Sequence, residues 1–471
     1  MADETVYPYI PNSVPDVRER MLRTIGIDSV EDIYAEIPAH LRFRGRLETP
    51  GPIASEYALR RHVEELLEKN ADCKRYLGFL GGGVWHHHVP SVVSTIMARD
   101  EFLTSYVGEA YADHGKWQAQ FEFASCIAEL VEMDMVNTPT YDWGMAAATA
   151  LRMAARITAR DEVLYAANIS PERLSCMKNY ALSAVPTLTA VAIDPLSGLL
   201  DLADLAAKLT GRVAALYFEN PAFLGMIETQ VAEIAEMVHA AGALACVGVD
   251  PISLGVLEAP GLYGADICVG DLQPLGIPMQ AGGGLGGFVA SADEPRFTGE
   301  FPSLLFGLTP TVVSGEYGFG EVFFERTSYA SREKAKDFLG TMAQLHGIGA
   351  GVYLALMGPQ GMRELGAGIM QRAAYCAAQL GALPGVAAPR YSAPHFKEFV
   401  VDFSATGRSV AEINKALLAR RIHGGKDLSA MFPALGESAL YCVTEVHTKD
   451  DLDALAGALR DILAVRPDEG D

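Results

Sequence analysis

The histidines that could carry acid–base chemistry gather in one segment, Trp85-His86-His87-His88, which follows a glycine-rich run at 78–83. Imidazole changes its charge near neutral pH, so such a histidine could move a proton or stack on a ligand ring. A metal site is not predicted, because successive residues point in different directions and no acidic or cysteine partner stands at metal-ligand spacing. The simpler interpretation is a polar loop after a glycine turn.

Polar residues also follow two apolar stretches that are typical of strands. Asn220-Pro221 comes after a strand that ends in Glu219, and Asp250-Pro251 comes after the run ALACVGV. Ligands of open α/β folds bind at the carboxyl ends of parallel strands, so these residues are candidate binding groups. Each pair could equally be a turn, since Asn, Asp and Pro are all common turn residues.

The glycine-rich segment 282–287 is a weaker candidate. A phosphate-binding loop would need a helix after it and usually a Lys-Ser/Thr pair, whereas here a strand-like run follows. We therefore expect these glycines to allow a close approach of two backbones and not to bind a nucleotide.

Strands that alternate with helices between about residue 160 and residue 290 predict the framework that positions these groups. The expected strands are 162–166, 213–219, 243–249, 265–269 and 286–290, with an amphipathic helix at 230–241. Near-continuous apolar strands of this kind are typical of a parallel sheet covered by helices on both faces.

Helical patterns lie on either side of this region. They are expected at 13–25, 29–37, 52–70, 115–135 and 143–159, and again at 332–380 with a break at GPQGM, 358–362. The last ninety residues predict strand 396–403, helix 410–421, strand 439–446 and helix 449–465. The expected domains are a helical arm (1–50), a large domain (51–330), and a linking helix with a small C-terminal α/β domain (331–471). The arm could wrap a partner or pack on its own domain.

Composition limits the function classes. The 471 residues carry a formal charge of −22, which argues against nucleic acid or an anionic membrane surface as a partner. The seven cysteines are scattered without a C-x-x-C pair, as expected of free thiols in a reducing compartment. The start has no apolar signal segment, and no apolar run reaches the roughly 20 residues that span a bilayer. We expect a soluble, cytoplasmic protein.

The stretch VDPISLGVLEAPGLYGADICVGDLQPLGIP (249–278) resembles the central signature of the alpha subunit of the two-chain glycine decarboxylase, the P-protein of the glycine cleavage system. Further stretches agree in the same order: 9–38, 79–93, 121–137, 217–228, 355–365, 396–401 and 441–455. The resemblance implies an α/β fold of fold-type I PLP-dependent transferases (aspartate aminotransferase-like), with a large parallel-sheet domain and a small C-terminal domain. It also implies a homologous beta subunit that carries the PLP.

The chain itself lacks the lysine that such an enzyme needs. By the resemblance, Asp250 matches the aspartate that pairs with the pyridine nitrogen, and Gln273 stands near the position of the Schiff-base lysine. No lysine occurs between Lys208 and Lys334. An amide nitrogen is not basic and forms no internal aldimine. We therefore expect the partner, and not this chain, to bind PLP.

Other family positions imply a shared pocket and a degenerate site. His87 matches the family histidine, Trp85 stands where the family has tyrosine, and both are expected to contribute catalytic groups to the partner's pocket. The family's Tyr-Asp-Gly turn is here Tyr141-Asp142-Trp143, and the indole would reach toward the place of a phosphate. We call the following set the pseudo-site and expect protein atoms to fill it: Tyr141, Asp142, Trp143, Asn220, Asp250 and Gln273.

Three segments depart from the family pattern. The family's PYQPE-x-SQG is here GEAYADHG (108–115), its Pro-Gly-Arg is Phe301-Pro302-Ser303, and its REQHIRREKATSN keeps only 332–335. These are segments in which the family's interface and substrate pocket lie, so glycine specificity is less firmly implied than the fold.

The leading hypothesis is the alpha subunit of a PLP-dependent glycine decarboxylase, inactive alone, in a heterotetramer with a lysine-bearing beta subunit. The assembled enzyme would pass the aminomethyl group to a lipoyl carrier, the H-protein. A second hypothesis is a paralogous pair that acts on another amino acid or amine. A third is a pseudoenzyme that serves as a scaffold or regulator.

Overall fold

The computed structural model describes residues 6–7, 9–43, 45, 47–103, 114–282, 285–302, 304–336, 339 and 343–464. Contacts between these residues divide the chain into two compact units, one up to Asn70 and one from Ala71 onward. The first unit thus extends to residue 70, whereas the predicted arm ended at residue 50.

The first unit contains two amphipathic helices, α1 (Pro15–Ile25) and α2 (Glu56–Leu67). Pro15 suits the first turn of α1, and Gly26 ends that helix in the left-handed conformation that glycine adopts without strain. The hydroxyl of Ser55 caps α2 by accepting from the Ala58 N–H. Neither helix has a buried residue. The predicted helix at 29–37 is a 3₁₀ turn over Val30–Tyr34.

A seven-stranded mixed sheet forms the centre of the second unit. Its order is β2 (Met135–Val136), β8 (Gly287–Ser291), β7 (Ile267–Asp271), β6 (Leu244–Val249), β5 (Val213–Glu219), β3 (Glu162–Ala166) and β4 (Thr187–Val191). The strands from β7 to β4 run parallel, as predicted. The expected parallel orientation of 286–290 is wrong, because β8 pairs antiparallel with β7. The chain returns from β7 to β8 through a loop without a crossover helix, and such a return makes neighbours antiparallel.

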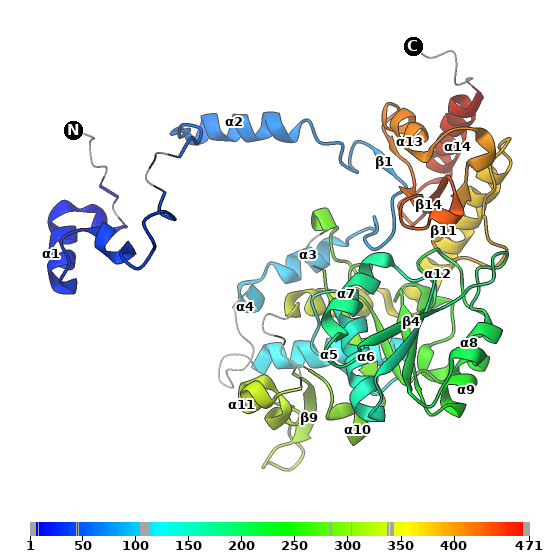
Figure 1. Ribbon diagram of the computed structural model, residues 1–471, viewed down its shortest axis with the longest axis horizontal. Helices are drawn as coiled ribbons and strands as arrows, with labels where there is room; N and C mark the ends of the chain where they lie inside the picture. The colour runs from blue at the N-terminus through cyan, green and yellow to red at the C-terminus, as the bar shows by residue number, and fades with distance from the viewer. Residues whose placement is uncertain are drawn as a thin grey trace. The chain divides into compact units, whose positions relative to one another are not determined.

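Helices cover both faces of this sheet (Figure 1). They are α6 (Trp143–Thr158), α7 (Pro171–Ala181), α8 (Leu202–Lys208) and α9 (Val231–Ala240). Right-handed crossovers place α7 on one face and α8 and α9 on the other, and α6 packs beside α7. All the alanines of α6 are buried, so this helix approaches the strands closely. Strand β4 and helices α7 and α8 were absent from the sequence prediction.

Helix α12 (Gln344–Gly381) leads to the small domain. Gly358 (φ 60°, ψ 179°) and Pro359 interrupt it, which confirms the break predicted at 358–362. The predicted start of this helix at residue 332 is wrong. Arg332 has a left-handed φ of 50° and begins a 3₁₀ turn that ends at Lys334.

In the small domain, β11 (Glu398–Asp402), β14 (Ser438–Cys442) and β13 (Lys426–Asp427) form an antiparallel sheet. Helices α13 (Val410–Leu418) and α14 (Lys449–Ala464) lie beside it (Figure 1). Strand β1 (Leu77–Gly78) pairs with β12 (Ile422–His423), so the segment before the histidines is attached to this domain. The other elements are α3 (Ser91–Met97), α4 (Asp100–Leu103), α5 (His114–Val131), α10 (Pro295–Thr298), β9 (Phe306–Pro310), β10 (Tyr317–Glu321) and α11 (Ser328–Ser331).

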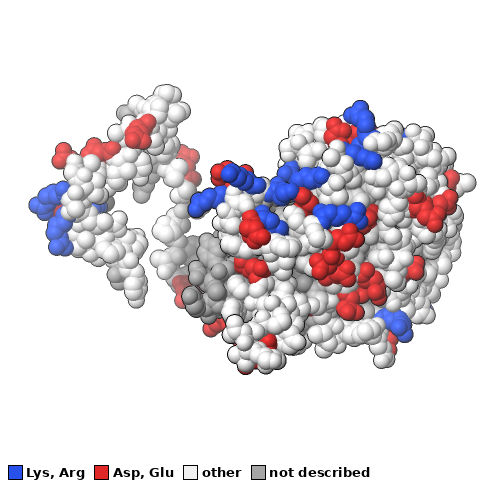
Figure 2. All heavy atoms as spheres, turned by 90° about the horizontal axis from the view of Figure 1, so that it is seen from below, with Lys and Arg blue, Asp and Glu red and all other residues white. Residues whose placement is uncertain are grey.

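On the face shown in Figure 2, acidic and basic side chains lie next to one another. Among the described residues, no helix is both long enough and apolar enough to cross a membrane.

Candidate functional site

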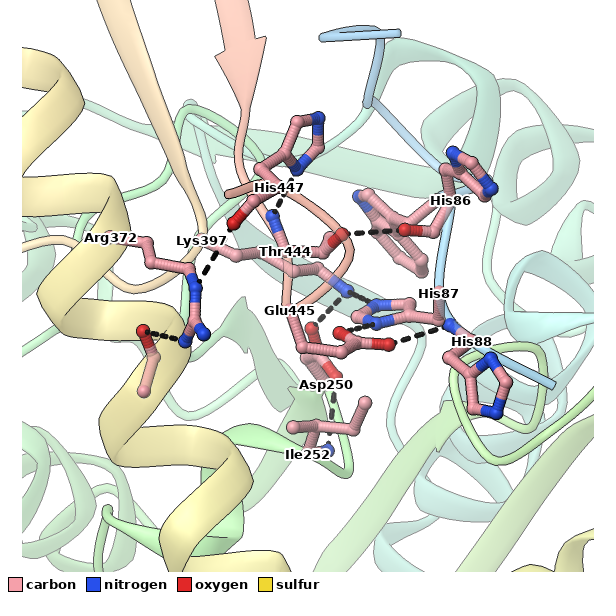
Figure 3. A network of polar contacts seen from close by, with 12 residues as sticks. His86, His87, His88, Asp250, Ile252, Arg372, Lys397, Thr444, Glu445 and His447 are labelled. Atoms are coloured by element: carbon pink, nitrogen blue, oxygen red, sulfur yellow. Dashed lines mark hydrogen bonds and ion pairs between the residues drawn. The ribbon is translucent and has the colours of Figure 1, made fainter. Parts of the chain in front are cut away.

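An aspartate and a lysine from different domains meet at the carboxyl end of the central strand β6. Asp250 follows β6, and its Oδ1 accepts from the Ile252 N–H at 3.1 Å. Its Oδ2 lies 2.5 Å from Nζ of Lys397, which directly precedes β11 of the small domain (Figure 3). Both side chains are buried, at 6% and 3% exposed. This ion pair therefore joins the small domain to the large one.

His87 and Trp85 complete the surroundings of Lys397. The ammonium lies 3.1 Å from Nε2 of His87 and 3.6 Å from the centre of the Trp85 ring. An ammonium can only donate, so Nε2 is the acceptor and the proton of a neutral imidazole is on Nδ1. That Nδ1 donates to Oε2 of Glu445 at 2.8 Å. Burial, together with the charge of Lys397, lowers the pKa of His87, in agreement with a neutral ring.

Glu445, which follows β14, holds the histidine segment on the small domain (Figure 3). Its Oε1 accepts from the His88 N–H at 2.6 Å, and the Thr444 hydroxyl donates to the His86 carbonyl at 2.6 Å. Burial raises the pKa of Glu445, but the hydrogen bonds from His87 and His88 outweigh it and bring the pKa to about 2. Glu445 is therefore a permanent anion at physiological pH.

Gln273 is fully engaged within the chain. Its Oε1 accepts from the Trp85 N–H at 3.0 Å, and its Nε2 donates to the carbonyls of Trp85 at 2.9 Å and Ile277 at 3.1 Å. The side chain is buried. The amide therefore fixes the loop that carries Trp85 and leaves no nitrogen facing a ligand.

An aromatic ring packs at the start of α6. Asp142 caps the helix, accepting from the Met145 N–H at 2.7 Å. Trp143 is 3% exposed, and the guanidinium of Arg173 lies 4.0 Å from the centre of its ring. Arg173 in turn donates two hydrogen bonds of 2.6 Å to Glu219. A buried ion pair and an indole thus lie beside the region where the resemblance places a phosphate.

Two predicted pseudo-site residues take no part in the contacts around Lys397 and Arg173. Tyr141 is 47% exposed and takes no part in the contacts described above. Asn220 closes a turn, because its amide exchanges two hydrogen bonds with the backbone of Glu228. The turn-forming interpretation is therefore the one that its contacts support.

The residues around Asp250 leave too little space for a pyridine ring at that carboxylate. Between the cluster and the neighbouring loop remains a cavity of about 20 Å³, lined by Trp85, Trp143, Asp250 and Lys397 among others. Such a space holds about one water molecule and no pyridine ring. The oxygen of Asp250 that would face a ring nitrogen is already paired with Lys397.

A wider hollow of about 390 Å³ opens beside it, between 81–83 and the first turns of α6 and α7. Asp271 lies at its wall, accepts from the Gln273 N–H at 2.8 Å and is 3% exposed. Burial raises the pKa of Asp271 to about 7.

Of the glycines in 282–287 that were predicted to allow a close approach, Gly287 does so, whereas a Cβ on Gly282 would meet nothing within 4 Å. A Cβ on Gly287 would lie 2.2 Å from the Asp142 carbonyl oxygen, so β8 can pass the cap of α6 only with glycine there. A Cβ on Gly81 would lie 2.1 Å from Oε1 of Glu398, which accepts from the Gly82 N–H at 2.6 Å.

Sequence reasoning missed Lys397, Glu445, Arg173 and Glu219. Their partners are far away in the chain, and only the stretch FKEFVV gave a signal, since it places two charged residues at the start of an apolar strand. Residues 108–113 of the first divergent segment, and Ser303, lie outside the described residues. Within the described part of the chain, no group of His, Cys, Asp or Glu is arranged to hold a metal ion.

Comparisons with solved structures agree with this architecture. A structure described as glycine decarboxylase (P-protein) of the glycine cleavage system, in inhibitor-bound form, matches with a TM-score of 0.84 and 34% identity. The match covers 97% of this chain and 100% of that one. A sphingosine-1-phosphate lyase from Burkholderia pseudomallei has a TM-score of 0.63 at 13% identity, covering 91% and 94%. That likeness shows the fold alone and confirms the fold-type I prediction.

Sequence comparisons are more specific. A protein named probable glycine dehydrogenase (decarboxylating) subunit 1, from Staphylothermus marinus, is 37% identical over 465 residues, covering 97% of this chain and 98% of the relative. A protein of the same name from Geobacillus kaustophilus is 37% identical over 458 residues, covering 97% and 99%. The family model for the glycine cleavage system P-protein matches residues 8–459. The chain therefore belongs to the glycine cleavage system P-protein family.

Proposed function

We propose that this chain is the alpha subunit of a heteromeric, PLP-dependent glycine decarboxylase and that it does not hold the cofactor itself. The proposal depends on one observation: the side chains at the two positions that would hold a cofactor are both engaged by other residues of the chain. Gln273 is bonded to the Trp85 backbone, and Asp250 is paired with Lys397. The relatives named subunit 1 support a two-chain enzyme.

In this proposal a homologous, lysine-bearing beta subunit binds PLP and decarboxylates glycine. The aminomethyl group then passes to a lipoyl carrier, the H-protein. This chain supplies a rigid, water-excluding wall next to the partner's pocket. Two αβ units would form the α2β2 heterotetramer.

The first unit supports a protein partner. Leu59, Val63 and Leu66 recur at helical spacing on α2 and are 46%, 42% and 50% exposed. An apolar stripe on a helix is normally covered by protein, because its burial removes apolar surface from water. We propose that the beta subunit covers it.

The expected catalytic roles of His87 and Trp85 change in this proposal. Only 1% of the His87 side chain is exposed, and Trp85 is 3% exposed, so neither ring reaches the surface of the described chain. We propose that they are positioning residues, which hold the loop 79–90 against the small domain and thereby shape the wall that faces the partner.

The test is the assembled complex with a candidate lysine-bearing partner. We expect glycine-dependent exchange of bicarbonate carbon, and after borohydride reduction with PLP we expect the mass adduct on the partner alone. A PLP adduct on a lysine of this chain would refute the division of labour. A complex that does not turn over glycine but turns over another amine would favour the hypothesis of a paralogous pair. Full activity of the partner alone would favour a scaffold.

A further inference from the structure

We infer that Lys397 is the built-in counter-ion of Asp250, standing where a cofactor's ring nitrogen would stand, and that it locks the small domain over a site closed to PLP. The inference rests on the proposed function and extends it, because it assigns a cause to the closure.

The Lys397 ammonium is chemically similar to a protonated ring nitrogen. The ring nitrogen of a PLP cofactor, when protonated, offers one cationic N–H to an aspartate at the end of a sheet strand. The Lys397 ammonium likewise places a cationic nitrogen next to Asp250, 2.5 Å from its Oδ2. Trp85 presents its ring face to the cation at 3.6 Å, where the negative face of an indole attracts positive charge.

Both members of the ion pair have a further contact within the chain. Asp250 has its other oxygen on the Ile252 N–H, and Lys397 makes its further contact with Nε2 of His87. A buried carboxylate without a cation is strongly unfavourable, so removal of Lys397 would leave an uncompensated charge. A ring nitrogen could reach Asp250 only by displacing a lysine that is already paired, because the cavity next to Asp250 has a volume of only about 20 Å³.

The two partners of the ion pair lie in different domains. Asp250 follows β6 of the large domain, whereas Lys397 precedes β11 of the small domain. The ion pair therefore acts between the two domains, and the His87–Glu445 hydrogen bond of 2.8 Å orients the imidazole that contacts Lys397 (Figure 3). Opening the small domain would separate a buried cation from a buried anion.

The experiment is a double-variant cycle on the full chain, with Asp250→Asn, Lys397→Met and the two combined. Each single variant leaves one buried charge unpaired, and we expect its unfolding temperature to fall by on the order of 5 °C. The double variant removes both charges and should recover most of that loss. A double variant that falls by the sum of the two single effects would overturn the inference. Lys449→Met is the matched control, because Lys449 pairs with Asp453 on the surface and is 70% exposed.

A second measurement remains informative if a single variant does not fold. Reductive methylation of the native full chain, followed by peptide mass mapping, should label Lys449 readily and Lys397 at least tenfold more slowly. Equal labelling of the two lysines would overturn the inference. The outcomes separate the two claims. If the effects of the Asp250 and Lys397 variants are additive and this chain gains no PLP adduct, only the inference about Lys397 is refuted. If the effects are not additive but a different lysine of this chain gains the adduct, only the proposed function is refuted.

Discussion

Gln273 and Trp85 lie 188 positions apart in the chain, and the side-chain amide of the one forms two hydrogen bonds with the backbone of the other. A glutamine is suited to this arrangement because it presents an acceptor and a donor side by side. Lysine has no acceptor, so it could not bond the Trp85 N–H. The position that would hold a cofactor in a related enzyme is here part of the packing of a loop.

Restoring the missing lysine should therefore not restore a cofactor site. We expect Gln273→Lys to bind no PLP and to lower the free energy of unfolding by about 1–3 kcal/mol, the cost of leaving a buried backbone donor unsatisfied. Borohydride reduction with PLP and intact mass would check the first point, and thermal unfolding the second. A specific adduct at the new lysine would contradict our account of a filled site.

The buried carboxyl of Asp271 predicts a dependence of stability on pH. Burial raises its pKa to about 7, against about 3.9 in the unfolded chain. Between these values the folded chain keeps a proton that the unfolded chain has lost, so the free energy of unfolding falls as pH rises from about 4 to about 7. Above pH 7 both states are ionised and this contribution stays constant.

Asp271→Asn removes that titration and can keep the acceptor for the Gln273 N–H. We expect the variant to gain stability over the native chain at about pH 8 and little at about pH 4, with a full difference on the order of 4 kcal/mol. Thermal unfolding of both proteins across this range is the measurement. A gain that does not change with pH would show that Asp271 titrates normally.

The Arg173–Glu219 pair should be important for stability. Glu219→Gln leaves the buried guanidinium of Arg173 without its counter-charge, and we expect a loss of about 3–5 kcal/mol. Urea unfolding would measure it. In the control, Arg60→Lys changes an exposed pair with Glu64, 76% and 58% exposed, and should cost less than about 1 kcal/mol. Equal effects of the two variants would contradict the role of the buried pair.

Two glycine positions allow a matched comparison. Gly287→Ala places a Cβ 2.2 Å from the Asp142 carbonyl oxygen, and we expect a loss of about 1–3 kcal/mol as β8 and the α6 cap move apart. Gly457 lies within α14 and has no neighbour within 4 Å of such a Cβ. Gly457→Ala should therefore be neutral or stabilise by up to about 1 kcal/mol. Thermal unfolding of both variants would show whether the change in stability depends on the room available for the added Cβ. Equal changes in the two variants would contradict this explanation.

Local signals in the sequence predicted the elements better than their connections. The apolar runs gave the strands from β5 to β8 to within a residue or two, since burial on both faces leaves a continuous apolar pattern. The direction of β8 depends on the loop before it, which carries no such pattern. Lys397 reaches His87 across 310 positions, and a contact of that range leaves no periodic trace in one sequence. The site was therefore found only in part.

The apolar stripe of α2 gives the test of the proposed partner. Replacing Leu59, Val63 and Leu66 together by serine removes apolar surface that is exposed on the first unit. We expect the unfolding temperature of the chain alone to stay within about a degree of the native value. If the beta subunit buries the stripe, the three changes should cost about 3 kcal/mol of binding and raise the Kd roughly 100-fold.

The matched control lies on the opposite side of the same helix. Arg61 and Glu65 are 63% and 66% exposed and are separated from the stripe by about half a turn. Replacing both by serine should leave the affinity within about threefold, because exposed ion pairs contribute little. Calorimetric titration against the partner measures both variants. If the apolar and the charged replacements weaken binding equally, or not at all, the stripe is not the surface that the beta subunit covers.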